Sequence, residues 1–167
     1  KLKSIDVSRF NTSKAQDMSS MFAECYSLKT INGIEDFDTS NVTTMWTMFG
    51  NCHSLGNLDL SGFDTGKCTT LGGMFVNCSS MTSIDISSFV TDHVINMERL
   101  FSGCSKLSSL NLGASFNTVY AESLSQMFMD CASLTSLDLS GFDTRDVKDF
   151  SSMFKGCTSL ENLDISS

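Results

Sequence analysis

The sequence predicts an α/β solenoid, in which one chain winds into stacked coils that each contain a short parallel strand and a short helical segment. A block reading Met-Phe-x-x-Cys-x-x-Leu, or nearly so, returns six times at a step of 26 or 27 residues. Its cysteines are Cys25, Cys52, Cys78, Cys104, Cys131 and Cys157. A second phenylalanine keeps the same step, at Phe10, Phe37, Phe63, Phe89, Phe116 and Phe142. Self-similarity of this length indicates that each repeat is one coil stacked on the last.

The strand of each coil is predicted from a period of two. Leu58 and Leu60 alternate with Asp59 and Ser61, which is the pattern of a short, half-buried strand. The same alternation returns at 84–87, 110–112, 137–140 and 163–166. Stacked in register, these strands would form a parallel sheet along one face, with the Leu and Ile side chains inside.

After the second phenylalanine the period changes. Asp-Thr or Asn-Thr, which favour turns and helix N-caps, usually follow it. Apolar residues then recur at helical spacing, as at Val42, Met45, Met48 and Phe49, and again at Val147, Phe150, Met153 and Phe154. This predicts a one-sided helix of about two turns in each coil. The extra residue of the longer steps falls within 31–37 and 110–116, where we expect the bends to bulge.

Charge and composition exclude several classes of protein. The net charge of −8 argues against a nucleic-acid partner, which requires clustered Lys and Arg. No apolar run approaches the roughly 20 residues that cross a bilayer, so we expect no membrane insertion. Residues 1–167 are predicted to form a single repeat domain of about six coils. No polar cap is recognisable at either end, so we expect a fragment of a longer array or end-to-end self-association.

The cysteines of the repeated block form one column, with one cysteine in each coil. Such a residue is most simply a small buried hydrophobe with a weak S–H donor. Disulfides remain an alternative, because neighbouring coils about 4.8 Å apart lie within bridging distance. Cys68 falls where other coils have Val42, Val94 and Val147, and is interpreted as a core substitution.

Taken together, these motifs resemble the BspA-like leucine-rich repeats of bacterial surface proteins, near the spirochaete-type class. The resemblance rests on Leu-x-x-Leu-Asp-Leu-Ser-x-Phe-Asp-Thr followed by Val-x-x-Met-x-x-Met-Phe-x-x-Cys-x-x-Leu, and it covers essentially the whole chain. It implies a right-handed leucine-rich-repeat coil and an extracellular or cell-surface location. It also implies adhesion to host or matrix proteins, or to glycans, without a cofactor.

Residues that break the repeat are the first candidates for partner binding, because packing of the core does not require them. These are Trp46, Tyr120, Tyr26 and His53, which stand where other coils have mostly small or polar residues. Exposed aromatic rings are favoured anchors at protein interfaces and in sugar stacking. The alternative is that they pack against a neighbouring loop or another copy of the chain.

Two acidic columns are the second group of candidates. The outward face of the sheet carries Asp6, Asp59, Asp85, Asp138 and Asp164. Asp38, Asp64 and Asp143 follow the second phenylalanine and could hold calcium between coils. The favoured alternative is that these side chains cap local N–H groups and keep the surface soluble. Asn11, Asn41 and Asn77 begin Asn-x-Ser/Thr sequons and could carry glycans in a secreted eukaryotic protein.

Catalytic motifs are absent from the sequence. It contains no Gly-x-Ser-x-Gly elbow, His-Glu-x-x-His pair or P-loop, and His53 and His93 lie at different phases of the repeat. We therefore expect no enzymatic activity. Two functions remain: a surface module that binds a protein or glycan, and a structural spacer or filament subunit.

Overall fold

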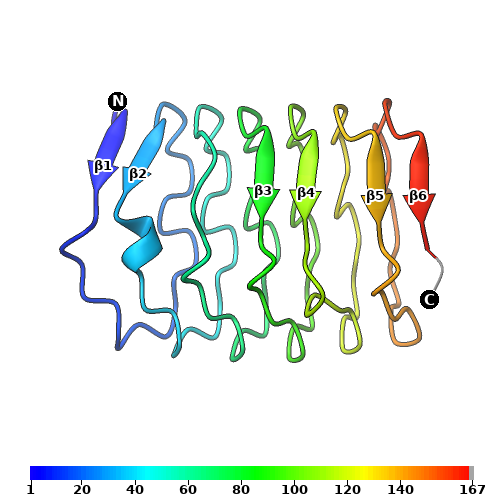
Figure 1. The fold of residues 1–167 in the computed structure, drawn as a ribbon, viewed down its shortest axis with the longest axis horizontal. Helices are drawn as coiled ribbons and strands as arrows, with labels where there is room; N and C mark the ends of the chain where they lie inside the picture. The colour runs from blue at the N-terminus through cyan, green and yellow to red at the C-terminus, as the bar shows by residue number, and fades with distance from the viewer. Residues whose placement is uncertain (166–167) are drawn as a thin grey trace.

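The chain is a stack of similar coils, as Figure 1 shows along its full length. The computed structural model describes residues 1–165 of the 167. Its regular elements are β1 (Ser4–Asp6), β2 (Thr30–Asn32), the 3-10 helix η1 (Ile34–Asp36), β3 (Ser83–Asp85), β4 (Ser109–Asn111), β5 (Ser136–Asp138) and β6 (Asn162–Asp164). The strands lie side by side on one face, and the two ends of the chain lie at opposite ends of the stack (Figure 1). Among the described residues, none forms a helix long and apolar enough to cross a membrane.

The short parallel strands predicted from the sequence are confirmed. β1 pairs with β2, β3 with β4 and β5 with β6, always in parallel and shifted by one coil, as in the pairing of Ile5 with Ile31. Residues 58–60 share the alternating pattern but form no strand. There the Asn57 side-chain carbonyl accepts hydrogen bonds from the Thr82 and Ser83 amides at 3.0 and 3.1 Å. The sheet is therefore three separate pairs rather than one continuous ladder.

The predicted helices are wrong. Residues 1–165 contain no α-helix, and the segments with helical spacing are runs of turns joined by isolated parallel bridges, such as those linking Thr44 to Asp17 and to Thr70. Amides on these turns donate to the next coil, for example from Phe22 to the Met48 carbonyl at 2.9 Å. We name this surface the turn face; it comprises residues 17–26, 44–53, 70–79, 96–105, 123–132 and 149–158.

The apolar spacing fits turns as well as it fits a helix. Each turn closes from one residue to the third along, so Met48 N–H donates to Met45 O and Cys52 N–H to Phe49 O. All four of these side chains are fully buried. Between them, Thr47 and Asn51 adopt left-handed backbone angles, with φ of 50° and 61°, which no α-helix contains. A two-turn helix is marginal alone, whereas hydrogen bonding to the neighbouring coils satisfies the same backbone groups.

The core is a set of continuous columns through the coils. Phe22 and Phe49 stack with ring centroids 5.7 Å apart and planes 1° apart, and this stacking continues coil by coil to Phe154. The cysteines form a parallel column of free thiols. In the column of the repeated block, each thiol from Cys52 onward donates to a phenylalanine carbonyl of the preceding coil, as Cys78 does to Phe49 O at 3.1 Å, whereas the buried Cys68 donates to Val42 O. Their interpretation as buried hydrophobes with a weak donor is confirmed, and the disulfide alternative is wrong for this fold.

Both longer steps contain a bend with a left-handed glycine, as the predicted bulges require. Gly33 has φ of 82° and Gly113 has φ of 77°. A Cβ on either glycine would lie 2.5 Å from the Cα of Ser8 or Ser87 in the preceding coil, so only glycine fits. The first bend continues into η1, whose Ile34 is buried, whereas Ala114 in the second bend is exposed.

Candidate binding surfaces

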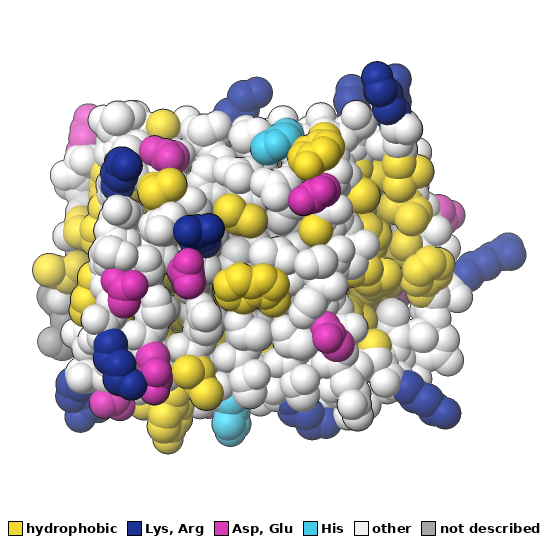
Figure 2. Space-filling view, turned by 180° about the vertical axis from the view of Figure 1, so that it is seen from behind, with side chains coloured by type: hydrophobic (Ala, Val, Ile, Leu, Met, Phe, Trp, Pro, Cys, Tyr) yellow, Lys and Arg dark blue, Asp and Glu magenta, His cyan; other side chains and the backbone are white. Residues whose placement is uncertain are grey.

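An exposed aromatic stack lies at one edge of the turn face. Tyr26 and His53 occupy the same position in successive coils, and their rings stack with centroids 5.5 Å apart and planes 14° apart. The Asn77 carbonyl lies 3.0 Å from His53 Nδ1 and holds the imidazole in place. Desolvation, followed by the charge of Glu24, raises the pKa of the Tyr26 phenol, so this ring is neutral at physiological pH. Figure 2 shows a histidine at the upper edge of this face, beside a large hydrophobic side chain.

Trp46 lies on the turn face and packs on the next coil. A Cβ at Gly72 would approach Trp46 Cζ3 to 2.2 Å, so the indole covers the one position in its column that has no side chain. The side chain nevertheless remains 38% exposed. The Trp46 ring therefore packs on the neighbouring coil and still exposes part of its surface.

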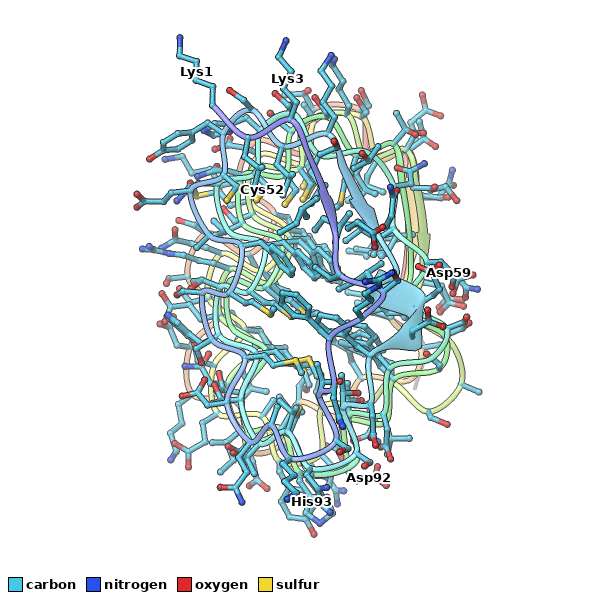
Figure 3. The ribbon with its side chains drawn as sticks, turned by 90° about the vertical axis from the view of Figure 1, so that its left-hand side faces the viewer. Lys1, Lys3, Cys52, Asp59, Asp92 and His93 are labelled. Carbon is cyan, nitrogen blue, oxygen red and sulfur yellow. The ribbon has the colours of Figure 1, made fainter. Side chains whose placement is uncertain are left out.

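Tyr120 does not belong to this group. It lies on the opposite edge, at the repeat position that His93 occupies one coil earlier, and it is 59% exposed. Figure 3 shows His93 at the lower edge and Cys52, the neighbour of His53 in the chain, near the upper one. The two histidines are therefore far apart, and the predicted aromatic candidates divide into an upper group on the turn face and Tyr120 below.

The first acidic column forms the outer surface of the sheet, where Figure 3 shows Asp59. Its carboxylates cap their own turns: Asp59 Oδ1 accepts hydrogen bonds from the Ser61 amide at 3.0 Å and hydroxyl at 2.7 Å. The other turns of this type are Asp6 with Ser8, Asp85 with Ser87 and Asp138 with Ser140. These hydrogen bonds lower the pKa of each carboxyl. Asp164, the last of the column, lies in β6.

The second acidic column caps turns in the same way. Asp38 accepts from the Ser40 hydroxyl at 2.6 Å, and Asp64 from the Gly66 amide at 2.9 Å. Hydrogen bonds from Arg145 lower the pKa of Asp143 to about 2. Within residues 1–165, no three His, Cys, Asp or Glu side chains come together as a metal-binding group. The calcium hypothesis thus has no supporting cluster, and the geometry favours the capping alternative.

The three sequon asparagines differ in their surroundings. Asn11 and Asn41 are exposed, and the Asn41 amide donates to Ser13 O at 3.0 Å. Asn77 is half-buried, and its amide donates to Asn51 Oδ1 at 2.8 Å. A glycan at Asn77 would therefore break this amide pair.

Comparison with known proteins places the chain in a family. The family described as "Mycoplasma protein of unknown function, DUF285" matches residues 1–113 and 82–167. The chain belongs to the DUF285 family. A comparison with curated protein sequences gives no significant match.

Solved structures show the fold of this DUF285 chain. A leucine-rich repeat protein from Bacteroides ovatus ATCC 8483 superposes with a TM-score of 0.53 at 20% identity, over 97% of this chain and 37% of that protein. A leucine rich cell surface protein from Faecalibacterium prausnitzii A2-165 matches with a TM-score of 0.38 at 14% identity, over 98% of this chain and 60% of that one. The leucine-rich-repeat resemblance is thereby confirmed for the fold. The chain spans 37% of the length of the first protein.

Sequence reasoning missed a buried threonine column at the lower edge. Thr39 Oγ1 donates to Asp64 O at 2.9 Å and accepts from the Asp64 amide at 2.7 Å, which ties neighbouring coils together. Thr65, Thr91 and Thr118 also donate to the carbonyl of the following coil. The signal in the sequence is the Thr two residues after each second phenylalanine, from which the sequence alone predicts only a turn or a helix N-cap.

Sequence reasoning also missed the left-handed residues of the turn face. The position before each cysteine is left-handed in all six coils: Glu24, Asn51, Asn77, Gly103, Asp130 and Gly156. Five of these six, all except Glu24, are Gly, Asn or Asp, the residue types that tolerate this conformation best. Together with the glycine pair at 72–73, this column is the sequence signal that would have favoured turns over a helix.

Proposed function

We propose that this DUF285 chain is part of an extracellular or cell-surface repeat protein that binds a protein or glycan through the aromatic part of its turn face, without catalysis. One observation carries the proposal. Tyr26 and His53 stack in the open on the first two coils and Trp46 is exposed on the same turn face, while the repeated polar side chains are used in capping turns.

The geometry suits a flat ligand face. The Tyr26–His53 stack and the Trp46 ring are held by the coils beneath them, so little conformational entropy is lost when a partner binds. Aromatic rings of this kind contact sugar faces and apolar protein side chains equally well. Asn51 and Asn77, linked by their side chains on the same face, offer polar groups at the edge of such a contact.

Two observations support the non-catalytic part of the proposal. The interior cysteines are buried, and burial raises the pKa of Cys52 to about 11, so these thiols are poor nucleophiles. The acidic residues of the two columns accept hydrogen bonds from their own turns, and within residues 1–165 no three of them converge as a cluster.

The test is a binding screen of the segment on arrays of oligosaccharides and of extracellular-matrix proteins. We expect Tyr26→Ala and Trp46→Ala each to weaken a positive interaction about tenfold or more, because buried aromatic anchors dominate interfaces. Tyr120→Ala, an equally exposed tyrosine on the opposite edge, is the matched control and should bind normally. Loss of binding in the control alone, or in none of the three, would contradict the proposal.

End-to-end association is a second candidate, and the backbone of the end coils favours it. Four amides of the last coil, at residues 150, 152, 154 and 156, have no acceptor among the described residues. Four carbonyls of the first coil, at residues 17, 19, 21 and 23, likewise have no donor there. These groups match the register that joins all interior coils. Exposed Phe10 and Met21 at one end and Phe150 at the other add apolar surface.

Sedimentation of the isolated segment over a range of concentrations tests this second role. We expect concentration-dependent association that Phe150→Asp removes, because the charge would have to be buried in the contact. A monomer at all concentrations would show that the end coils do not associate in this segment.

A further inference from the structure

The sheet face is open between β4 and β5. No hydrogen bond joins these two strands, although each is paired on its other side. A cleft of about 500 Å³ lies between them. Figure 1 shows β4 and β5 as neighbours on the front of the stack, with a wider separation than β3 and β4. On the turn face the same two coils are closed, because the Phe128 amide donates to the Met153 carbonyl at 3.0 Å.

The cleft differs from the other break in the sheet. The space between residues 58–60 and β3 has no room for a water molecule. The volume at β4 and β5 lies in the range of about 300 to 1,000 Å³ that is typical of ligand sites. The break between β4 and β5 therefore offers room for a ligand.

Unpaired backbone groups border the cleft. The Asn111 carbonyl accepts a hydrogen bond from the Ile86 amide, so the backbone N–H and C=O groups of Asn111 face β3. The backbone groups of the adjacent Leu110 therefore face β5. The Leu139 amide donates to the Asp164 carbonyl, so the backbone groups of Leu139 face β6. The backbone groups of the adjacent Asp138 therefore face β4. Both walls of the cleft thus present the hydrogen-bonding edge of a strand.

The side chains that line the cleft restrict which extended ligands it can bind. Apolar surface comes from Leu112, Phe116, Leu137 and Phe142, and small residues at Ala114 and Gly141 keep the mouth open. Asp138 is the one charged side chain among the described residues that line it. Its carboxylate caps the turn at Ser140, which holds it at the rim.

We propose that this cleft binds an extended peptide segment of a basic partner protein, which adds as a strand between β4 and β5 and places a Lys or Arg side chain against Asp138. Main-chain hydrogen bonds to the two strand edges would provide affinity, as in other cases of strand addition. Alternate side chains of the peptide would meet the apolar floor. This site is separate from the aromatic surface on the turn face, so either proposal can fail without the other.

The probe is a fluorescein-labelled, end-blocked Val-Lys-Val-Lys-Val peptide, with binding to the folded segment followed by anisotropy. We expect saturable binding that drops at least about tenfold when both lysines are replaced by glutamate, because like charges would face Asp138. We expect a similar drop for a peptide with alternate N-methylated amides, which cannot pair with a strand edge. Equal binding of the N-methylated peptide would overturn strand addition.

Matched variants locate the site. Ala114→Tyr should block the cleft and abolish binding, because Ala114 is exposed and lines it. Ala132→Tyr is the control, since Tyr26 occupies the same repeat position, and it should bind like the parent. Asp138→Asn should weaken binding of the lysine peptide and leave a neutral Val-Thr-Val-Thr-Val peptide unaffected. Unchanged binding in Ala114→Tyr, confirmed as folded by circular dichroism, would overturn the proposal, as would competition by a neutral oligosaccharide.

Discussion

The two bends that carry an extra residue accommodate that residue in different ways. Both place a glycine in the left-handed region against a serine of the preceding coil, Gly33 against Ser8 and Gly113 against Ser87. The first bend is closed, because η1 directs Ile34 into the core, where it is 1% exposed. The second forms no helical turn, and it borders the cleft between β4 and β5.

The difference lies in where the extra residue falls. In the first bend Gly33 precedes the inward aliphatic residue, so Ile34 still reaches the core. In the second bend the inward residue, Leu112, comes first and is only half-buried, and Gly113 and Ala114 follow it. Neither β2 nor β4 pairs with any described strand of the following coil, so the two bends differ in how the inward residue packs and in the cleft of about 500 Å³ that the second bend lines.

The largest expected effect comes from truncating the inward residue of the closed bend. Ile34→Ala should destabilise the segment by about 2–5 kcal/mol, because it leaves a cavity in a packed core. Leu112→Ala, its counterpart in the open bend, should cost less than about 2 kcal/mol, since half of that side chain already meets solvent. Urea unfolding of the two variants measures both values. Equal losses would mean that the two bends are packed alike.

The glycines should matter equally in both bends. Gly33→Ala and Gly113→Ala should each destabilise by roughly 1–3 kcal/mol, because alanine is strained at positive φ and its Cβ would collide with the serine backbone. Gly56→Ala is the control, since the nearest atom to its added Cβ lies 3.5 Å away, and it should change stability by less than about 1 kcal/mol. Thermal unfolding checks all three. A neutral Gly113→Ala would show that the open bend does not need its left-handed residue.

The cysteine column crosses the open region without interruption, so its thiols should not sense the cleft. Burial raises the pKa of Cys131 to about 12, so almost no thiolate forms at pH 8. We expect a thiol reagent to leave Cys131 unmodified in the folded segment, while the half-buried Cys25 of the first coil reacts. Mass spectrometry after timed labelling measures both residues. Rapid labelling of Cys131 would show that the coils separate down to the core.

The smallest expected effect concerns acid. Turn-capping hydrogen bonds lower the pKa of Asp59 and Asp138 below the usual 3.8. A carboxyl whose pKa is lower in the folded chain than in the unfolded chain stabilises the fold. This stabilisation is fully present above the pKa of the unfolded chain and is lost as the pH falls through the pKa of the folded chain. Stability should therefore decline below about pH 4. Asp59→Asn, which keeps an oxygen to cap the turn, should show a slightly weaker decline in melting temperature between pH 5 and pH 2.

Much of this fold follows from the sequence because its period is long and regular. The alternation of apolar and polar residues predicted the short parallel strands, as at Ile84, although Leu58 and Leu60 form none, and the Cys78 column predicted a stacked, unpaired thiol. The helix prediction failed because inward residues three apart, such as Met45 and Met48, fit a turn as well as a helix. Only the left-handed residues of the turns, such as Thr47 between these two methionines and Asn51 before Cys52, distinguish the two.

The candidate sites were less predictable, since surface contacts depend on which coils meet. That Trp46 breaks the repeat is visible in the sequence, but its contact with Gly72 depends on the register between coils. The cleft at Asp138 lies beside a bend in which Leu112 and Gly113 exchange the order seen at Gly33 and Ile34. Composition and periodicity carry no information on that order.

Hydrogen exchange of backbone amides, resolved by residue with NMR, tests the central claim most directly: the coils that contain β4 and β5 are joined on the turn face and open on the sheet face. We predict that the Phe128 amide, bonded to Met153, is strongly protected, while the Leu110 and Asp138 amides in the cleft exchange rapidly. Protection of Asp138 equal to that of Phe128 would show a continuous sheet across β4 and β5 and would contradict the account.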